Sequence, residues 1–292
     1  MYANIEIDEV VKLYRIVKKE HLNPTVVRME IEAPEVSRRA RAGQFIILRA
    51  DADGERIPLT VADYDRERGT VTIIFQIVGA GTETLRHLNV GDSVADFAGP
   101  LGRPTETEGL KTVAVVGGGV GSAIAYPVAK KLFSEGAHVD AIIGFRTRDL
   151  VILEDEFRKS SSELYLMTDD GTYGEHGLVT EALERLILSG KKYDEVIAIG
   201  PLPMMKFVSL LTKKYGVKTI VSMNPIMIDG TGMCGCCRLT VGGETKFACV
   251  DGPEFDGHLV DFDEAIRRSK MYRDFEEHSR EEACNLFKKE VE

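Results

Sequence analysis

Short apolar runs alternate with turn residues over the first hundred residues of the chain. Branched and apolar side chains gather at 10–19, 25–31, 45–49 and 70–77, and Gly, Pro, Asn or Asp occur in the intervening stretches. Runs of this length and composition predict β-strands. Strands that follow one another at this spacing predict an antiparallel barrel or sandwich.

The pattern changes near Lys111. The run TVAVV at 112–116 is typical of a strand buried on both faces, and a helical pattern follows at 120–133. Strands then alternate with helices, which predicts a doubly wound parallel sheet. The further strands are expected at 138–144, 163–167, 194–199 and 217–221, and the further helices at 153–159, 178–188 and 203–215.

The last quarter of the chain has two parts. Residues 223–261 are Gly-rich, show little periodicity and contain four of the five cysteines. The tail at 262–292 is charged, but the spacing of its apolar residues predicts an amphipathic helix that can be interrupted once. We therefore expect four segments: a β-barrel at 1–105, an α/β domain at 106–222, a metal-binding segment at 223–261 and a helical tail at 262–292.

Composition narrows the possible functions. The formal net charge is −10, so the chain lacks the basic character of a nucleic-acid-binding protein. No apolar run approaches the length of a membrane span, and the first residues do not resemble a signal peptide, so a cytoplasmic protein is expected. Clustered cysteines in a reducing compartment indicate a metal site rather than disulfides.

The stretch VGGGVGS at 116–122 joins a predicted strand to a predicted helix. Glycines there allow backbone N–H groups to approach a phosphate at the helix N-terminus. The spacing departs from a strict G-x-G-x-x-G, and a plain tight turn is the alternative. The candidate nucleotide-binding residues are Gly117, Gly118, Gly119, Val120, Gly121 and Ser122.

Two later turns follow predicted strands, at the sheet edge where ligands of such folds gather. One is TDDGTYGEHG at 168–177, where Asp169 and Asp170 would accept hydrogen bonds from a ribose and repel a 2′-phosphate. That favours NAD(H), although a solvated acidic turn remains open and nearby arginines at 146 and 148 would suit a 2′-phosphate. The other turn, GPLPMMK at 200–206, adds Gly200 and Met204.

The barrel half contains RIPLT at 56–60 and IFQIVGAGT at 74–82, followed by GPLG at 99–102. Taken with GGGVG and GPLPMM, their order and spacing resemble the ferredoxin reductase-like flavoproteins. That resemblance implies FAD on the barrel and a pyridine nucleotide on the α/β domain. It assigns Thr60 to a contact with flavin N5, with no acid–base residue, and the FAD site to Arg56, Pro58, Leu59, Thr60, Ile74, Phe75, Gln76, Gly79, Gly81 and Thr82.

Within this family the chain is most similar to electron-transfer subunits with a C-terminal [2Fe–2S] segment. One branch serves dihydroorotate dehydrogenase, and the other is the small (alpha) subunit of NADH-dependent reduced ferredoxin:NADP oxidoreductase. The resemblance implies electron transfer between NAD(H), FAD and a [2Fe–2S] cluster. It also implies a larger iron–sulfur flavoprotein partner that reacts with NADP(H) and ferredoxin and carries out electron bifurcation.

Cysteine spacing defines the expected cluster. Plant-type [2Fe–2S] sites use C-x₄-C-x₂-C and a distant fourth ligand. Cys234 and Cys237 match the central pair and Cys249 the distant ligand, whereas the first position holds Asp229. The resemblance implies cysteine at this position in the dihydroorotate branch and aspartate in the ferredoxin:NADP branch, so Asp229 favours the latter. A zinc site formed by cysteines 234, 236, 237 and 249, and a set of unligated buried cysteines, remain alternatives. In the cluster interpretation Cys236 is a bystander, and no role is assigned to Cys284.

Overall fold

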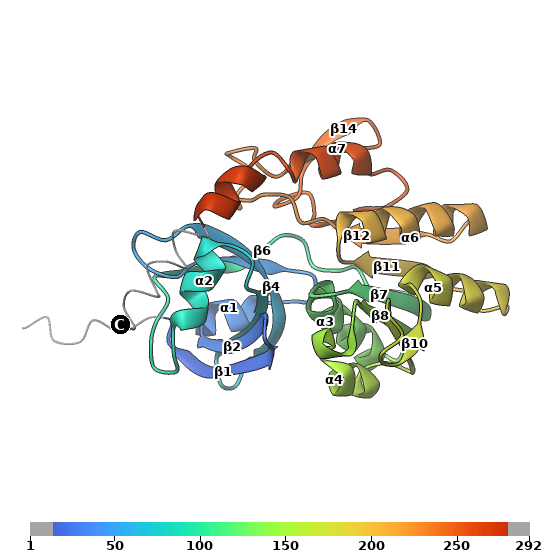
Figure 1. Ribbon diagram of the computed structural model, residues 1–292, viewed down its shortest axis with the longest axis horizontal. Helices are drawn as coiled ribbons and strands as arrows, with labels where there is room; N and C mark the ends of the chain where they lie inside the picture. The colour runs from blue at the N-terminus through green and yellow to red at the C-terminus, as the bar shows by residue number, and fades with distance from the viewer. Residues whose placement is uncertain (1–13, 280–292) are drawn as a thin grey trace, which may run out of the picture.

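Two sheets and a small ribbon form the core of the protein (Figure 1). The computed structural model describes residues 14–279. The first sheet has six strands in the order β1-β2-β5-β4-β3-β6, and the second has seven in the order β10-β9-β8-β7-β11-β12-β15. An antiparallel β-structure followed by a doubly wound sheet confirms the predicted fold class.

The first sheet closes on itself as a barrel. Backbone hydrogen bonds join Ile16 to Asp92 (2.8 Å) and Val94 to Tyr14 (3.2 Å), so the start of β1 meets the chain just before β6. Closure leaves the apolar side chains of these strands facing one core. The strands are β1 (Ile16–Asn23), β2 (Val26–Glu32), β3 (Phe45–Arg49), β4 (Arg56–Asp65), β5 (Thr70–Gln76) and β6 (Asp96–Leu101).

Several barrel elements differ from the sequence predictions. RIPLT and GPLG lie outside the four predicted strands of this half, but they form parts of β4 and β6. Pro100 is compatible with a strand because β6 is at the end of the hydrogen-bonded order, where a missing N–H costs little. GAGT begins helix α2 (Ala80–His87), and Pro34 begins α1 (Pro34–Arg39). The first predicted strand is displaced to 16–23, and its residues 10–13 lie outside the described residues.

The second sheet contains the predicted alternation of strands and helices. Its strands are β7 (Thr112–Gly118), β8 (His138–Phe145), β9 (Glu163–Thr168), β10 (Glu175–His176), β11 (Glu195–Ile199), β12 (Thr219–Ser222) and β15 (Glu254–Asp256). Its helices are α3 (Gly121–Ser134), α4 (Glu154–Lys159), α5 (Val179–Leu188) and α6 (Leu202–Tyr215). Helices α3 and α4 pack on one face, and α5 and α6 on the other. The chain runs outward from β7 in both directions, so the topological switch point lies between β7 and β11.

The cysteine segment is joined to both larger units. It contains the ribbon of β13 (Arg238–Val241) and β14 (Glu244–Phe247), and its β15 pairs antiparallel with β12. Phe45 and Ile47 of the barrel share one apolar core with Cys237, Cys249 and the residues of the second sheet. The cluster loop is therefore fixed between the barrel and the α/β domain.

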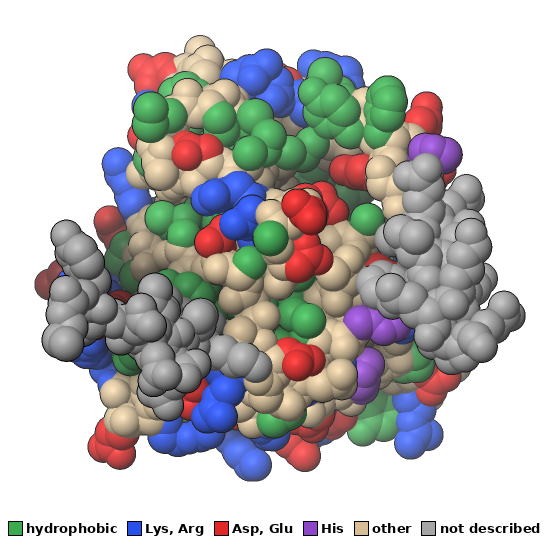
Figure 2. Space-filling view, turned by 90° about the vertical axis from the view of Figure 1, so that its left-hand side faces the viewer, with side chains coloured by type: hydrophobic (Ala, Val, Ile, Leu, Met, Phe, Trp, Pro, Cys, Tyr) green, Lys and Arg blue, Asp and Glu red, His purple; other side chains and the backbone are tan. Residues whose placement is uncertain are grey.

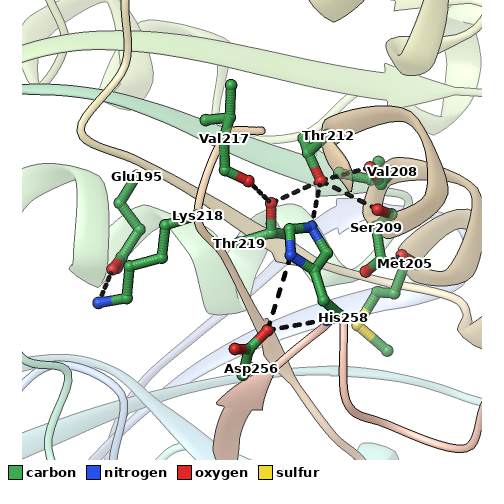
Figure 3. Close-up of polar contacts among 10 residues, drawn as sticks. All are labelled: Glu195, Met205, Val208, Ser209, Thr212, Val217, Lys218, Thr219, Asp256 and His258. Carbon is green, nitrogen blue, oxygen red and sulfur yellow. Dashed lines mark hydrogen bonds and ion pairs between the residues drawn. The ribbon is translucent and has the colours of Figure 1, made fainter. Parts of the chain in front are cut away.

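A polar network anchors the same segment to α6 (Figure 3). His258 Nε2 lies 3.0 Å from the Thr212 hydroxyl, and the Thr219 hydroxyl donates to Thr212 across 2.6 Å. The His258 backbone N–H also donates to Asp256. Because Thr212 and Thr219 are fully buried, breaking this network would leave polar groups without partners.

The tail begins as a helix that is interrupted once within the described residues. Helix α7 (Phe262–Arg268) has the Asp261 side chain as its N-cap, and a second helical stretch starts at 273 after a turn. The break agrees with the sequence prediction, and the rest of the tail lies outside the described residues. No helix within 14–279 is long and apolar enough to cross a membrane.

Candidate cofactor and cluster sites

The cluster loop faces the GPLG end of β6. A cavity of about 350 Å³ lies between them, lined by Pro100, Leu101, Gly102, Arg103, Gly230, Thr231, Cys249 and Val250. Gly230 has φ +80°, and a Cβ there would lie 2.6 Å from Ile47 Cδ1. Only glycine allows the loop to lie this close to the barrel.

Two of the predicted ligands form a buried pair. The Cys237 and Cys249 sulfurs are 3.2 Å apart, and each residue is 2% exposed. Burial and the neighbouring Cys237 thiol raise the pKa of Cys249 to about 12. The backbone N–H of Gly232 faces the Cys249 sulfur and acts in the opposite direction. An electron-rich sulfur at this position would therefore receive a hydrogen bond from the loop.

The other two predicted ligands lie together at the exposed side of the loop. Backbone N–H groups of Cys236 and Asp229 face the Cys234 sulfur and lower the pKa of that thiol. The Asp229 carboxylate accepts hydrogen bonds through Oδ2 from the hydroxyl and backbone N–H of Thr231 and from the backbone N–H of Met233. These bonds lower the pKa of Asp229. All three bonds end on Oδ2, so none of them occupies Oδ1.

Cys236 is half-buried beside Cys234, and the burial and the neighbouring thiol raise its pKa. Within residues 14–279 no three His, Cys, Asp or Glu side chains are close enough to hold a single metal ion. A [2Fe–2S] cluster is held by two ligands on each of two irons. The donor set fits this arrangement, because it consists of a Cys237–Cys249 pair and an Asp229–Cys234 pair on one glycine-rich loop.

The nucleotide loop lies at the switch point of the second sheet. It follows β7, and the turn containing Gly200 and Met204 follows β11, the neighbouring strand. A Cβ on Gly121 would lie 2.6 Å from Gly200 Cα, and a Cβ on Gly118 would meet the Met204 sulfur. Gly119 has φ +55° and open space beside it. The structure therefore brings these predicted residues together at the edge where ligands of such folds bind.

Ser122 has a buried side-chain oxygen without a hydrogen-bond partner. This hydroxyl lies in the first turn of α3, where the helix N-terminus favours an anion. A buried hydroxyl without a partner is uncommon in proteins. The first turn of α3 therefore retains one buried hydroxyl that no group within residues 14–279 engages.

Asp169 and Asp170 follow β9, two strands away from β7 on the same edge. Asp170 Oδ1 accepts hydrogen bonds from the backbone N–H and the hydroxyl of Thr172, which lower its pKa. The Arg148 guanidinium lies over the Tyr173 ring at 5.3 Å. The loop therefore presents an exposed carboxylate, and its Tyr173 ring packs against Arg148 from the turn after β8; the sequence identified both Asp170 and Arg148.

Predicted flavin residues divide into exposed and buried groups. Arg56, Pro58, Leu59 and Thr60 lie on β4 and are exposed or half-buried. Phe75 is 2% exposed and packs in the barrel core, whereas Ile74 packs toward the α/β domain. These two side chains are committed to cores, so they can offer a cofactor only their backbone. Gln76 is half-buried at the end of β5.

The first turn of α2 is saturated by its own neighbours. The Thr82 hydroxyl accepts from the backbone N–H groups of Val78 and Gly79, each at 3.0 Å. The Gly81 N–H donates to Glu55 Oε1 across 2.7 Å. Sequence reasoning did not identify Glu55, because a single acid in a loop carries no spacing signal. A phosphate at this turn would have to replace the Glu55 carboxylate.

Comparisons with known proteins identify the family. The family model described as the iron-sulfur cluster binding domain of dihydroorotate dehydrogenase B matches residues 224–261. A Thermotoga maritima homologue of the dihydroorotate dehydrogenase B electron transfer subunit is 48% identical, covering 92% of this chain and 95% of its own. The chain belongs to the family of these electron-transfer subunits and their homologues.

Other similarities agree with this assignment. The electron transfer subunit of dihydroorotate dehydrogenase B from Fusobacterium nucleatum is 32% identical, covering 78% of this chain and 90% of its own. A solved structure concerned with flavin-based electron bifurcation by NADH-dependent reduced ferredoxin-NADP oxidoreductase is 46% identical, with a TM-score of 0.88 over 92% of this chain and 97% of that one. A cytochrome P450 reductase from Amycolatopsis, 20% identical with a TM-score of 0.58 over 69% of this chain and 65% of its own, shares the fold.

The family assignment confirms several sequence predictions. The chain is an oxidoreductase subunit of the ferredoxin reductase-like class, and FAD, NAD(H) and an iron–sulfur cluster are its cofactors. The match of residues 224–261 to an iron–sulfur cluster binding domain identifies this segment as an iron–sulfur site rather than the alternative zinc site. The individual cofactor-binding residues and cluster ligands stay predictions.

Proposed function

We propose that the chain is the small electron-transfer subunit of an NADH-dependent reduced ferredoxin:NADP oxidoreductase. The observation that carries the proposal is the similarity to the bifurcating oxidoreductase structure, which extends over 97% of that chain at 46% identity. Asp229 supports the same branch, because the resemblance to that branch predicts an aspartate at the first ligand position, and its backbone N–H faces the Cys234 sulfur. Dihydroorotate dehydrogenase electron transfer remains the second candidate, favoured by the family model at 224–261.

Bound FAD would supply hydride exchange with NADH, and a [2Fe–2S] cluster would supply one-electron transfer with the flavin. The protein has to hold the nicotinamide and the flavin in contact while keeping the cluster within electron-transfer distance of the flavin. In this assignment, NAD(H) is bound by residues 117–122 together with Gly200 and Met204. These residues contact its phosphates and its nicotinamide half. Asp169 and Asp170 contact the ribose, and β4 with residues 79–82 holds the flavin.

The proposed cluster ligands are Asp229, Cys234, Cys237 and Cys249, with Cys236 outside the set. Carboxylate oxygen binds iron as a harder, less electron-rich donor than thiolate. The hydrogen bonds from Thr231 and Met233 occupy Oδ2 of Asp229, so Oδ1 is the oxygen available to iron. They also fix the carboxylate in one orientation.

The proposed partner is a larger iron–sulfur flavoprotein subunit that reacts with NADP(H) and ferredoxin. Four apolar side chains around the cluster loop are exposed: Ile226, Ile228, Val250 and Met233, the last at 89%. Figure 2 shows hydrophobic side chains gathered in the upper part of one face, where Figure 1 places the C-terminal segment. Exposed apolar groups next to an electron-transfer centre suit a protein interface.

Purification of the protein with its physiological partner tests the proposal. The expected complex contains flavin, about two irons and two sulfides in this chain, and it oxidises NADH with coupled reduction of ferredoxin and NADP. A partner that oxidises dihydroorotate would instead establish the second candidate. A colourless protein without iron and sulfide would refute both.

A further inference from the structure

Each proposed cluster ligand has a neighbouring backbone carbonyl that an arginine holds. Arg56 Nε donates to Ile228 O (2.9 Å), which precedes Asp229, and Arg103 Nε donates to Val250 O (3.1 Å), which follows Cys249. Arg238 Nη1 donates to Gly235 O (3.1 Å), which follows Cys234. Arg268 Nη2 donates to Cys236 O (3.3 Å), which precedes Cys237.

These arginines come from separate parts of the fold. Arg56 begins β4 and Arg103 follows β6, so both belong to the barrel. Arg238 begins β13, and Arg268 ends α7. The bonds from Arg56, Arg103 and Arg268 join positions 172, 147 and 32 residues apart. Local loop geometry alone therefore does not account for the arrangement.

We propose that Arg56, Arg103, Arg238 and Arg268 form an arginine collar that positions the four ligands and raises the reduction potential of the cluster. This inference rests on the ligand set proposed above. Arginine suits the task because its planar guanidinium stays charged and offers five donors. One donor can fix a ligand-bearing backbone while the others remain available.

The charges explain why a collar would matter in this chain. Three thiolates and a carboxylate give the cluster a net negative charge, which increases by one unit on reduction. A nearby cation therefore stabilises the reduced form more than the oxidised form. The whole chain carries a formal charge of −10, so the collar places positive charge where the overall charge would oppose reduction.

Arg56 could contact the flavin as well as the cluster loop. Resemblance to flavoproteins assigns it to the flavin pyrophosphate, whereas its Nε here holds the cluster loop. The remaining guanidinium donors are compatible with the phosphate contact. The same side chain would then connect the position of the flavin to that of Asp229, and Gly230 against Ile47 adds a second barrel contact on the other side of Asp229.

Single variants of the purified full chain test the collar. Arg103→Gln and Arg238→Gln remove a charge, while Arg103→Lys and Arg238→Lys retain it without the guanidinium fork. We expect each Gln variant to lower the ratio of reduced to oxidised cluster about three- to tenfold at a fixed solution potential, where tenfold corresponds to about 59 mV. The Lys variants should recover most of this ratio but alter the EPR line shape of the reduced cluster.

Arg66→Gln is the matched control. Arg66 Nη2 donates to the Ala40 carbonyl across 3.1 Å, which is a bond of the same kind between barrel residues. The Arg66→Gln substitution should leave the reduction potential and the EPR spectrum of the cluster unchanged. Wild-type potentials in both Arg103→Gln and Arg238→Gln, measured in protein that retains iron and sulfide, would overturn the collar alone. A wild-type chain without iron and sulfide would overturn the proposed function and the collar together.

Discussion

The Thr105 hydroxyl donates a 2.6 Å hydrogen bond to Oε1 of Glu254, connecting the end of the barrel to β15. A Cβ on Gly43 would lie 3.1 Å from the same carboxylate oxygen, so the barrel packs closely against it. Burial and the charges of Glu195 and Glu106 raise the pKa of Glu254 to about 7, against the smaller opposing effect of the Thr105 bond. Lys218 is paired with Glu195 in this region.

The pKa of Glu254 predicts a pH-dependent stability. Because its folded-state pKa is raised, the stabilisation is complete below the ordinary carboxyl pKa and is lost as pH rises through about 7. Glu254→Gln should match wild type near pH 5 and exceed it by about 1–3 kcal/mol near pH 8. Denaturant unfolding at both pH values measures this difference.

Thr105→Val provides a second check on the same carboxyl. Loss of the donated bond should raise the Glu254 pKa further and move the loss of stability to higher pH. Glu244→Gln serves as a control, because that side chain is exposed and paired with Lys246 on the ribbon. Equal pH dependence of wild type and Glu254→Gln would contradict the prediction.

Asp229→Cys should retain the cluster but change its reduction potential. The substitution replaces a carboxylate by a more electron-rich thiolate and removes the hydrogen bonds that Thr231 and Met233 donate to Oδ2. Iron and sulfide analysis with a redox titration measures both effects. Cys236→Ser is the companion variant and should preserve iron content and potential. Loss of the cluster in Cys236→Ser would place that cysteine in the ligand set.

Asp170→Asn should weaken the preference for NADH over NADPH. Asparagine keeps an acceptor for the Thr172 bonds but removes the charge that would repel a 2′-phosphate. We expect the ratio of kcat/KM values to fall roughly five- to tenfold, equivalent to about 1 kcal/mol for two charges at close range in water. Asp155→Ala, on α4, is the control. An unchanged ratio would mean that this loop does not contact the ribose.

The parallel sheet was predictable because its strands are buried and almost wholly apolar. Val113, Val115, Val139 and Ile197 are fully buried, and each belongs to a run that reads as a strand without further context. The barrel was harder to predict. RIPLT contains a proline and a leading arginine, and its strand character depends on pairing with β3, which lies outside any local sequence window.

The candidate site residues divide in the same way, into those that a local sequence motif identifies and those whose role depends on distant partners. Spacing identified the glycine loop and the cysteines, because motifs of contiguous residues carry their own signal. Glu55 and Arg103 were missed, since their roles depend on Gly81 and Val250, partners distant in sequence. Phe75 shows the opposite failure: its place in the flavin motif did not indicate that its side chain fills the barrel core.

Gly121→Ala and Gly118→Ala form the final prediction, which concerns the nucleotide loop. A methyl group at Gly121 would lie 2.6 Å from both Gly200 Cα and Ile199 O, which are backbone atoms of the neighbouring strand and turn. A methyl group at Gly118 would mainly meet the end of the flexible Met204 side chain. We expect Gly121→Ala to destabilise the protein by about 1–3 kcal/mol and to separate β7 from β11.

Comparing Gly121→Ala with Gly118→Ala distinguishes an effect on protein stability from an effect on nucleotide binding. Gly121→Ala should lower the melting temperature and weaken NADH binding together, because the displaced turn forms one wall of the switch point. Gly118→Ala should change the melting temperature little, since Met204 can adopt another rotamer, and should affect NADH binding alone. Thermal unfolding and NADH titration of both variants measure these effects. Equal destabilisation by the two substitutions would contradict the close backbone contact between Gly121 and Gly200.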